Sequence, residues 1–203
     1  MNTTMPNEIS LDALIAGDRV EFARLVHTYS GSIYRLGLKM LGNPQDAEDV
    51  LQNTFVNALM HVARFEGRSN IATWLYRIAA NEALMLIRKR KSEVSLEQES
   101  QDGEEENLED VKPRVFADWS GLPEDVLLSS EGKKHLDAAI QMLPETLRIV
   151  FVLRDIEGLS IKETADTLNL TETNVKTRLV RARMHLREQL SKYYMERFQE
   201  DER

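Results

Sequence analysis

Residues 159–190 read LSIKETADTLNLTETNVKTRLVRARMHLREQL and decide the fold of the C-terminal part of this chain. Ile161, Ala165 and Leu168 are spaced to line the inner face of a short helix, which ends at a turn. Thr171 or Thr173 can then cap a longer helix. At about 100° per residue, the apolar residues of that helix form one buried stripe: Val175, Leu179, Ala182, Leu186 and Leu190. A short helix, a turn and a longer helix form the helix-turn-helix arrangement.

The opposite side of the longer helix is basic. Residues 174–187 contain five Lys/Arg and no acid. Guanidinium groups pair with guanine edges or phosphates, and the N-terminal part of such a helix enters the major groove. The predicted DNA contacts are Asn174, Lys176, Thr177, Arg178 and Arg181. A solvated basic face would explain any one of them, but the short helix and turn beside it favour DNA binding.

The net charge of −8 is concentrated in one segment. Residues 93–125 hold 12 of the 34 acidic side chains and 2 of the 26 basic ones, which leaves a net of +2 elsewhere. Because DNA binding depends on local patches, the acidic total does not exclude it. The acidic stretch is typical of a linker. We therefore expect a first domain over 10–91, a linker over 92–126 and a second domain over 127–194.

Several classes of protein are disfavoured. The chain has no cysteine, which excludes disulfides and thiolate metal sites. No apolar run approaches the ~20 residues of a membrane span, and residues 1–11 lack a secretory layout, so we expect a cytoplasmic protein without membrane insertion. There is no phosphate loop, no dinucleotide turn and no zinc-binding histidine pair. We expect no enzyme activity, no cofactor and no metal.

The rest of the pattern is helical, with no alternating strand run, and predicts an all-α fold of two small domains joined by a flexible acidic linker. Helical spacing runs over 11–41, with breaks expected at Gly17-Asp18 and Gly31. Asn43 can cap the next helix, whose first position suits Pro44. Its buried face is predicted to be Ala47, Val50, Leu51, Thr54, Phe55, Ala58, Leu59 and Val62.

A loop is expected over 65–70, followed by a helix over about 71–90 that ends in RKRK. In the second domain, helices are expected at about 131–143, 145–157, 160–168 and 172–194. Pro144, Gly158 and the turn Asn169-Leu170 separate them.

Three segments, in this order, resemble the small extracytoplasmic-function (ECF) members of the bacterial sigma-70 family. Residues 46–55, DAEDVLQNTF, resemble the polymerase-binding helix of sigma region two. Residues 65–69, FEGRS, and 73–81, TWLYRIAAN, resemble its promoter-melting and minus-10 segment. Residues 174–183, NVKTRLVRAR, resemble the recognition helix of region four.

The resemblance implies a factor that binds core RNA polymerase through its β and β′ subunits and directs promoter-specific initiation at minus-35 and minus-10 elements. The residues implied to contact the β′ clamp helices are Asp46, Glu48, Asp49, Gln52 and Asn53. The family usually has an acid where Asn53 stands, which removes one charge-assisted contact. The residues implied at the minus-10 element are Phe65, Gly67, Arg68, Ser69, Asn70, Trp74, Arg77, Asn81, Arg88 and Arg90.

The chemistry of the minus-10 set suits an opened strand. An amide such as that of Asn81 can pair with an unstacked base edge by donor and acceptor together. Arg68 and Arg77 could hold the strand backbone. Trp74 and Tyr76 offer stacking surfaces, although core packing explains both equally well. The basic run 88–91 suits a helix C-terminus as well as phosphates.

Other interpretations stay open at this stage. A stand-alone helix-turn-helix regulator would dimerise and bind duplex DNA without polymerase, and a pure adaptor would bind polymerase without DNA. The acidic linker could mimic nucleic acid in the basic channel of the polymerase or act as a solvated tether. The resemblance also implies an anti-sigma factor as a partner, because such factors are often held inactive in this way.

Overall fold

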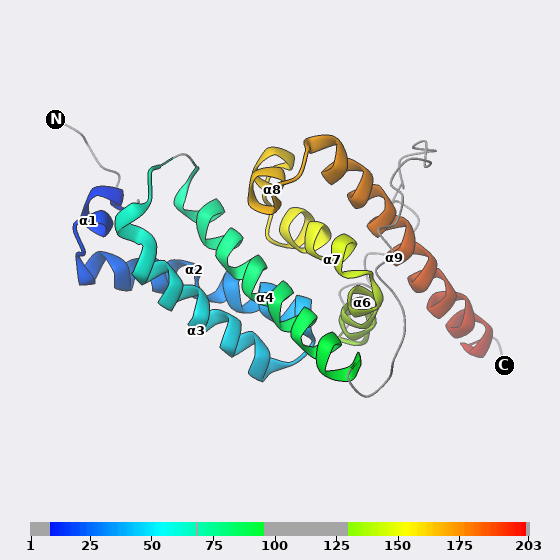
Figure 1. The fold of residues 1–203 in the computed structure, drawn as a ribbon. Helices are drawn as coiled ribbons and strands as arrows, with labels where there is room; N and C mark the ends of the chain where they lie inside the picture. The colour runs from blue at the N-terminus through cyan, green and yellow to red at the C-terminus, as the bar shows by residue number, and fades with distance from the viewer. Residues whose placement is uncertain (1–8, 68, 96–129, 202–203) are drawn as a thin grey trace.

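The computed structural model describes residues 9–67, 69–95 and 130–201. Over these ranges the chain is helical with no strand, which confirms the all-α prediction (Figure 1). Most of the predicted linker lies outside the described residues. No helix in the described ranges is long and apolar enough to cross a membrane.

The first domain holds helices α1 (Leu11–Ile15), α2 (Arg19–Leu41), α3 (Pro44–His61) and α4 (Ile71–Ser95), with a 3₁₀ turn η1 (Val62–Arg64) after α3. The caps follow the sequence closely. Asn43 accepts from the backbone N–H of Gln45 at 2.8 Å, and Pro44 takes the first position of α3. Gly42 ends α2 in the left-handed region at φ 70°, a conformation that glycine adopts without strain.

Three expectations for this domain are wrong. Gly31 does not break α2, because one helical glycine costs only about 1 kcal/mol and the helix buries Ile33 and Leu36. Leu59 is 60% exposed, since it lies about 100° from the centre of the buried stripe of α3. The helix predicted over 71–90 continues to Ser95, because residues 91–95 contain neither Pro nor Gly to stop it.

A close approach of α2 and α3 requires glycine at position 37. A Cβ there would lie 3.0 Å from the Cα of Ala47, which is backbone and cannot move aside. We expect Gly37→Ala to lower the free energy of unfolding by about 1–3 kcal/mol. Gly31→Ala, on the same helix, meets only the end of Arg35 at 3.6 Å and should raise it by up to about 1 kcal/mol. Urea unfolding of both variants checks this, and equal effects would contradict the packing described.

The second domain holds α6 (Ser130–Met142), α7 (Glu145–Phe151), a π-helical turn η2 (Val152–Ile156), α8 (Ile161–Leu168) and α9 (Glu172–Asp201). Ser160 and Glu163 form a reciprocal capping box at the start of α8. Asn169 ends α8 in the left-handed region at φ 54°. The helix-turn-helix predicted from the sequence is therefore present as α8, a turn and α9.

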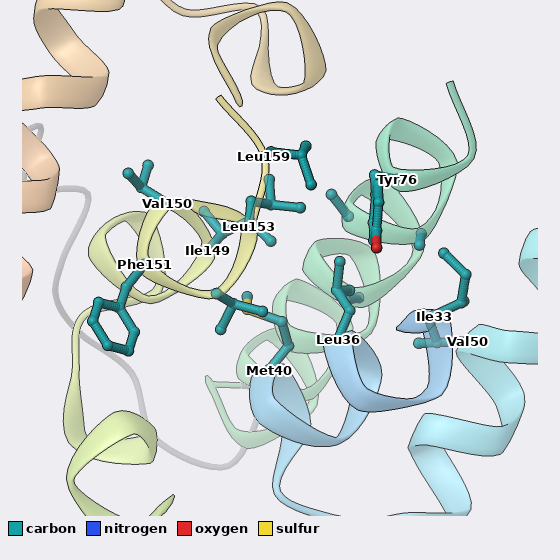
Figure 2. Close-up of a cluster of buried hydrophobic side chains, with 14 of the residues drawn as sticks. Ile33, Leu36, Met40, Val50, Tyr76, Ile149, Val150, Phe151, Leu153 and Leu159 are labelled. Atoms are coloured by element: carbon teal, nitrogen blue, oxygen red, sulfur yellow. The ribbon is translucent and has the colours of Figure 1, made fainter. Parts of the chain in front are cut away.

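The two helical domains pack against each other, an arrangement that the sequence did not predict. Helix α8 lies against α4, and α6, α7 and η2 lie against α2. The buried side chains of both domains form one cluster. Figure 2 shows the side chains of Leu153 and Leu159, from the second domain, facing the helices of the first domain that carry Leu36, Met40 and Tyr76.

Candidate polymerase and promoter interfaces

The outer face of α3 is polar at its N-terminal end. Glu48, Asp49, Gln52 and Asn53 are exposed, while Ala47 and Val50 are buried against the rest of the domain. Asp46 is half-buried and pairs with Arg90 of α4. The structure thus brings four of the five predicted polymerase contacts onto one free face and uses the fifth to tie α3 to α4.

The same face continues toward the C-terminal end of α3 with apolar side chains. Val56, Leu59 and Met60 are 56%, 60% and 68% exposed. The sequence did not predict that exposed apolar side chains extend the polar face of α3, because the pattern that indicates them is weak. Val56 and Met60 fall outside the buried stripe of α3, but solitary apolar residues on a surface are common.

The exposed side of α4 carries a second set of predicted contacts. Arg77, Asn81 and Arg88 are exposed at spacings of four and seven residues, which places them on one side of the helix. Because Asn81 is exposed, its amide is not a buried polar group that needs a hydrogen-bond partner within the protein. Arg90 lies about 200° round the helix from the centre of this set and points to α3, so the structure separates it from the others.

The loop before α4 is organised by Asn70. Its side-chain oxygen accepts from the backbone N–H of Thr73 at 2.6 Å and caps the helix, and its amide nitrogen donates to Glu163 at 2.9 Å. Trp74 packs on Phe65 with ring centroids 5.1 Å apart. Gly67 has φ 69° and Ser69 is half-buried. Arg68 lies outside the described residues.

Tyr76 belongs to the interior. It is 6% exposed, and its hydroxyl donates to Glu157 at 3.1 Å. Burial raises its pKa to about 12. Of the two aromatic residues whose role the sequence left open, Tyr76 is therefore a core residue, whereas Trp74 stays half-buried at the surface.

Helix α9 presents its predicted face. The apolar stripe is buried at every position: Val175, Leu179, Ala182, Leu186 and Leu190. Lys176 is exposed, and Asn174, Thr177, Arg178 and Arg181 are half-buried. Thr171 supplies the cap, since its hydroxyl accepts from the backbone N–H of Asn174 at 3.2 Å.

The arginines of α9 differ in their surroundings. Burial lowers the pKa of Arg178. Arg181 has a buried Nε with no hydrogen-bond partner among the described residues. Arg183 instead donates two hydrogen bonds to Asp155 at 2.8 and 2.9 Å, and this contact raises its pKa. Arg183 therefore fixes α9 to η2.

The fold is that of a helical protein of two domains, the second of which contains a helix-turn-helix. The family models "Sigma-70 region 2" and "Sigma-70, region 4" match residues 25–93 and 134–186. The ECF RNA polymerase sigma factor SigW of Bacillus subtilis is 38% identical over 174 residues, which cover 86% of this chain and 91% of SigW. The RNA polymerase sigma-H factor of Pseudomonas aeruginosa is 33% identical over 172 residues, which cover 82% of this chain and 84% of that protein.

Two solved structures share the fold. The sigma factor RpoE of Bartonella quintana, in complex with the anti-sigma factor NepR, is similar at a TM-score of 0.63 and 22% identity, covering 84% of this chain and 97% of that one. CnrH, in complex with the cytosolic domain of CnrY, is similar at a TM-score of 0.64 and 22% identity, covering 89% and 94%.

This chain belongs to the ECF RNA polymerase sigma factors of the sigma-70 family. It binds core RNA polymerase and directs transcription initiation at promoters. Sigma factors are DNA-binding initiation factors and not enzymes. Membership in this family disfavours the stand-alone regulator.

Proposed function

We propose that promoter recognition by this sigma factor is divided among three faces of the chain. The polar face of α3 binds the β′ clamp helices, the loop 65–70 with the exposed side of α4 captures the minus-10 strand, and α9 reads the minus-35 element. The single observation that supports the division is that each face is exposed or half-exposed while the apolar stripe behind it is buried. The domain limits 10–91, 92–126 and 127–194 belong to the same proposal.

On α3, the proposal includes the apolar extension. Glu48 and Asp49 supply charge that guides the approach to a basic partner, and Val56, Leu59 and Met60 supply apolar area beside them. Asn53 lacks the negative charge that the family usually has at its position, and the three exposed apolar side chains add contact area further along the helix. Asp46 acts indirectly, by fixing α3 to α4 through Arg90.

On α4 and α9, the proposal assigns different tasks to similar groups. Asn81 pairs with a base edge of the opened strand, with Arg77 and Arg88 on its phosphates. Arg181 and Arg178 read base edges of duplex DNA, and Lys176 contacts phosphate. Arg90 is left out of the DNA contacts because it faces α3.

The partners and setting follow from the family. An anti-sigma factor is proposed as the inhibitory partner, the cytoplasm as the location, and the polymerase channel as the place of the acidic linker during initiation. A similar fold has been solved in complex with an anti-sigma factor, and the linker carries charge of the same sign as nucleic acid.

Site-specific photocrosslinking tests the division. A benzophenone amino acid is placed at Asn53, Asn81 or Thr177, and the protein is irradiated in a complex with core polymerase and promoter DNA. We expect adducts to β′, to the minus-10 strand and to the minus-35 duplex, respectively. A probe at the exposed Asp12 of α1 controls for random adducts. Equal DNA adducts without polymerase, or none at all, would contradict the assignment.

A further inference from the structure

Two rows of side chains run next to each other along the outer side of α4. The polar row consists of residues proposed above for the minus-10 strand: Arg77, Asn81 and Arg88. The second row is apolar: Trp74, Ile78 and Met85. Each apolar residue precedes a polar residue by three positions, a spacing at which side chains on a helix surface are neighbours. The apolar row therefore borders the polar row along the helix.

The apolar row becomes more exposed toward the C-terminal end of α4. Trp74 and Ile78 are half-buried and pack against the hydrophobic core, and Trp74 also packs on Phe65. Met85 is 61% exposed and does not belong to the core. Core packing therefore explains the first two members of the row, whereas the apolar surface of Met85 is accessible from outside the domain.

The geometry of a helix directs Met85 toward Asn81. Side chains on a helix lean toward its N-terminus and cover the surface of the preceding turn. Met85 follows Asn81 by four residues, so its thioether covers the surface next to that amide. Arg88 follows Met85 by three residues. Met85 is thus flanked along the helix by an amide that can pair with a base and a guanidinium that can bind a phosphate.

The charge on α4 suits a nucleic acid. Residues 71–92 hold five basic side chains and one acid. The acid, Glu82, accepts a hydrogen bond from Asn57 of α3 at 2.9 Å and so takes part in a contact within the domain. Asn81 and Arg88 have no hydrogen bond or ion pair among the residues that the structure describes. A strand that lies along the polar row therefore meets positive charge and hydrogen-bond donors.

An apolar side chain beside these donors can distinguish thymine from the other bases. Among the DNA bases only thymine carries a methyl group at C5, on its major-groove edge. The other three bases lack this methyl group, and a thioether offers their polar edges no more than a weak hydrogen-bond acceptor. The methionine side chain is flexible and polarizable, so it can adapt to a small apolar group. The ligand that fits Met85 best is therefore the C5 methyl group of a thymine.

We propose that Met85 is a specificity-determining residue of the promoter interface, which contacts the C5 methyl group of a thymine next to the base bound by Asn81. This proposal rests on the proposed function of the α4 face and extends that face by one base. The additional base is selected through apolar contact, whereas Asn81 selects its base through hydrogen bonds. Met85 therefore affects which promoters are used and takes no part in the chemistry of RNA synthesis.

Replacement of thymine by deoxyuridine tests the contact, because it removes the C5 methyl group and leaves the base-pairing groups unchanged. A promoter found by run-off transcription is made with deoxyuridine at one thymine at a time, in either strand, across the minus-10 element. We expect one position at which deoxyuridine weakens binding by the complex of core polymerase and this protein about fourfold, the effect of burying one methyl group. With Met85→Ala, deoxyuridine at that position should have no effect.

Two further variants serve as controls. Met85→Leu keeps an apolar side chain of similar size and should preserve the effect of deoxyuridine to within about twofold. Met142→Ala makes the same truncation on α6, at a side chain that is 71% exposed, and should leave the effect of deoxyuridine unchanged. Leucine and alanine both favour helices, so circular dichroism should show equal helix content in all variants. Loss of the deoxyuridine effect in Met142→Ala would overturn the assignment to Met85.

Asn81→Ala separates this proposal from the proposed function. If Asn81→Ala leaves promoter binding unchanged, the proposed function of the α4 face is wrong. If Asn81→Ala weakens promoter binding but no thymine loses its deoxyuridine effect in Met85→Ala, only the methyl contact is overturned. Weaker binding of Met85→Ala to core polymerase in the absence of DNA would also overturn the methyl contact, because it would assign Met85 to a contact with the polymerase.

Discussion

Asp49→Lys on α3 lowers the affinity for core RNA polymerase by about 100-fold, and promoter-dependent transcription falls with it. Asp49 is exposed on the polar face, and its side chain has no hydrogen bond or ion pair among the residues that the structure describes. Placing a like charge against a basic partner costs several kcal/mol, which corresponds to a loss of this size. Titration of labelled variant into core polymerase measures the change, and urea unfolding verifies that the fold is retained.

The matched control for this result is Asp12→Lys. It makes the same change of charge at an exposed position of α1, a helix that packs against α2 and η1. We expect a change in polymerase affinity of less than about threefold, from the altered net charge alone. Similar losses for both variants would assign the effect to overall charge and would contradict a binding face on α3.

Arg181→Ala on α9 lowers transcription from a cognate promoter by roughly 10- to 100-fold and leaves polymerase affinity unchanged. One side chain that reads a base edge contributes about 1–3 kcal/mol of specific binding, and its loss relaxes the preference at that base. Arg181→Lys should recover little, because an ammonium lacks the planar fork of a guanidinium. Initiation assays over a library of mutated minus-35 elements measure both the rate and the relaxed position.

Arg187→Ala is the control on the same helix. Arg187 is exposed six residues nearer the C-terminus, beyond the part of a recognition helix that enters the groove. Its removal should weaken binding uniformly across sequences and reduce the salt dependence. If Arg187→Ala relaxed one position of the element and Arg181→Ala did not, the register assigned to α9 would be wrong.

Local signals predicted most of the helices. Asn43 and Pro44 mark the start of α3 correctly, because a cap and the first turn depend only on adjacent residues. The stripe from Val175 to Leu190 is buried as expected, because a helix with one apolar side packs with that side toward the core. The turn after α8 falls at Asn169, a residue type that tolerates the left-handed region.

The remaining features depend on contacts between distant parts of the chain. No local pattern in the sequence marks Glu157, and only the packing of α2 and α4 against η2 makes it a buried partner of Arg35. Arg90 was grouped with its basic neighbours, but its direction is set by Asp46, 44 positions earlier. Leu59 lies at the edge of the apolar stripe of α3, where the extent of the neighbouring helices decides whether a side chain is buried or exposed.

Run-off transcription with purified bacterial core polymerase and a library of genomic fragments, with and without this protein, tests the central claim most directly. A sigma factor that uses α3, α4 and α9 as assigned should produce new, discrete start sites that share two upstream boxes, and Asp49→Lys should strongly reduce their transcripts. No new start sites, together with a dimer that binds duplex DNA without polymerase, would contradict the account.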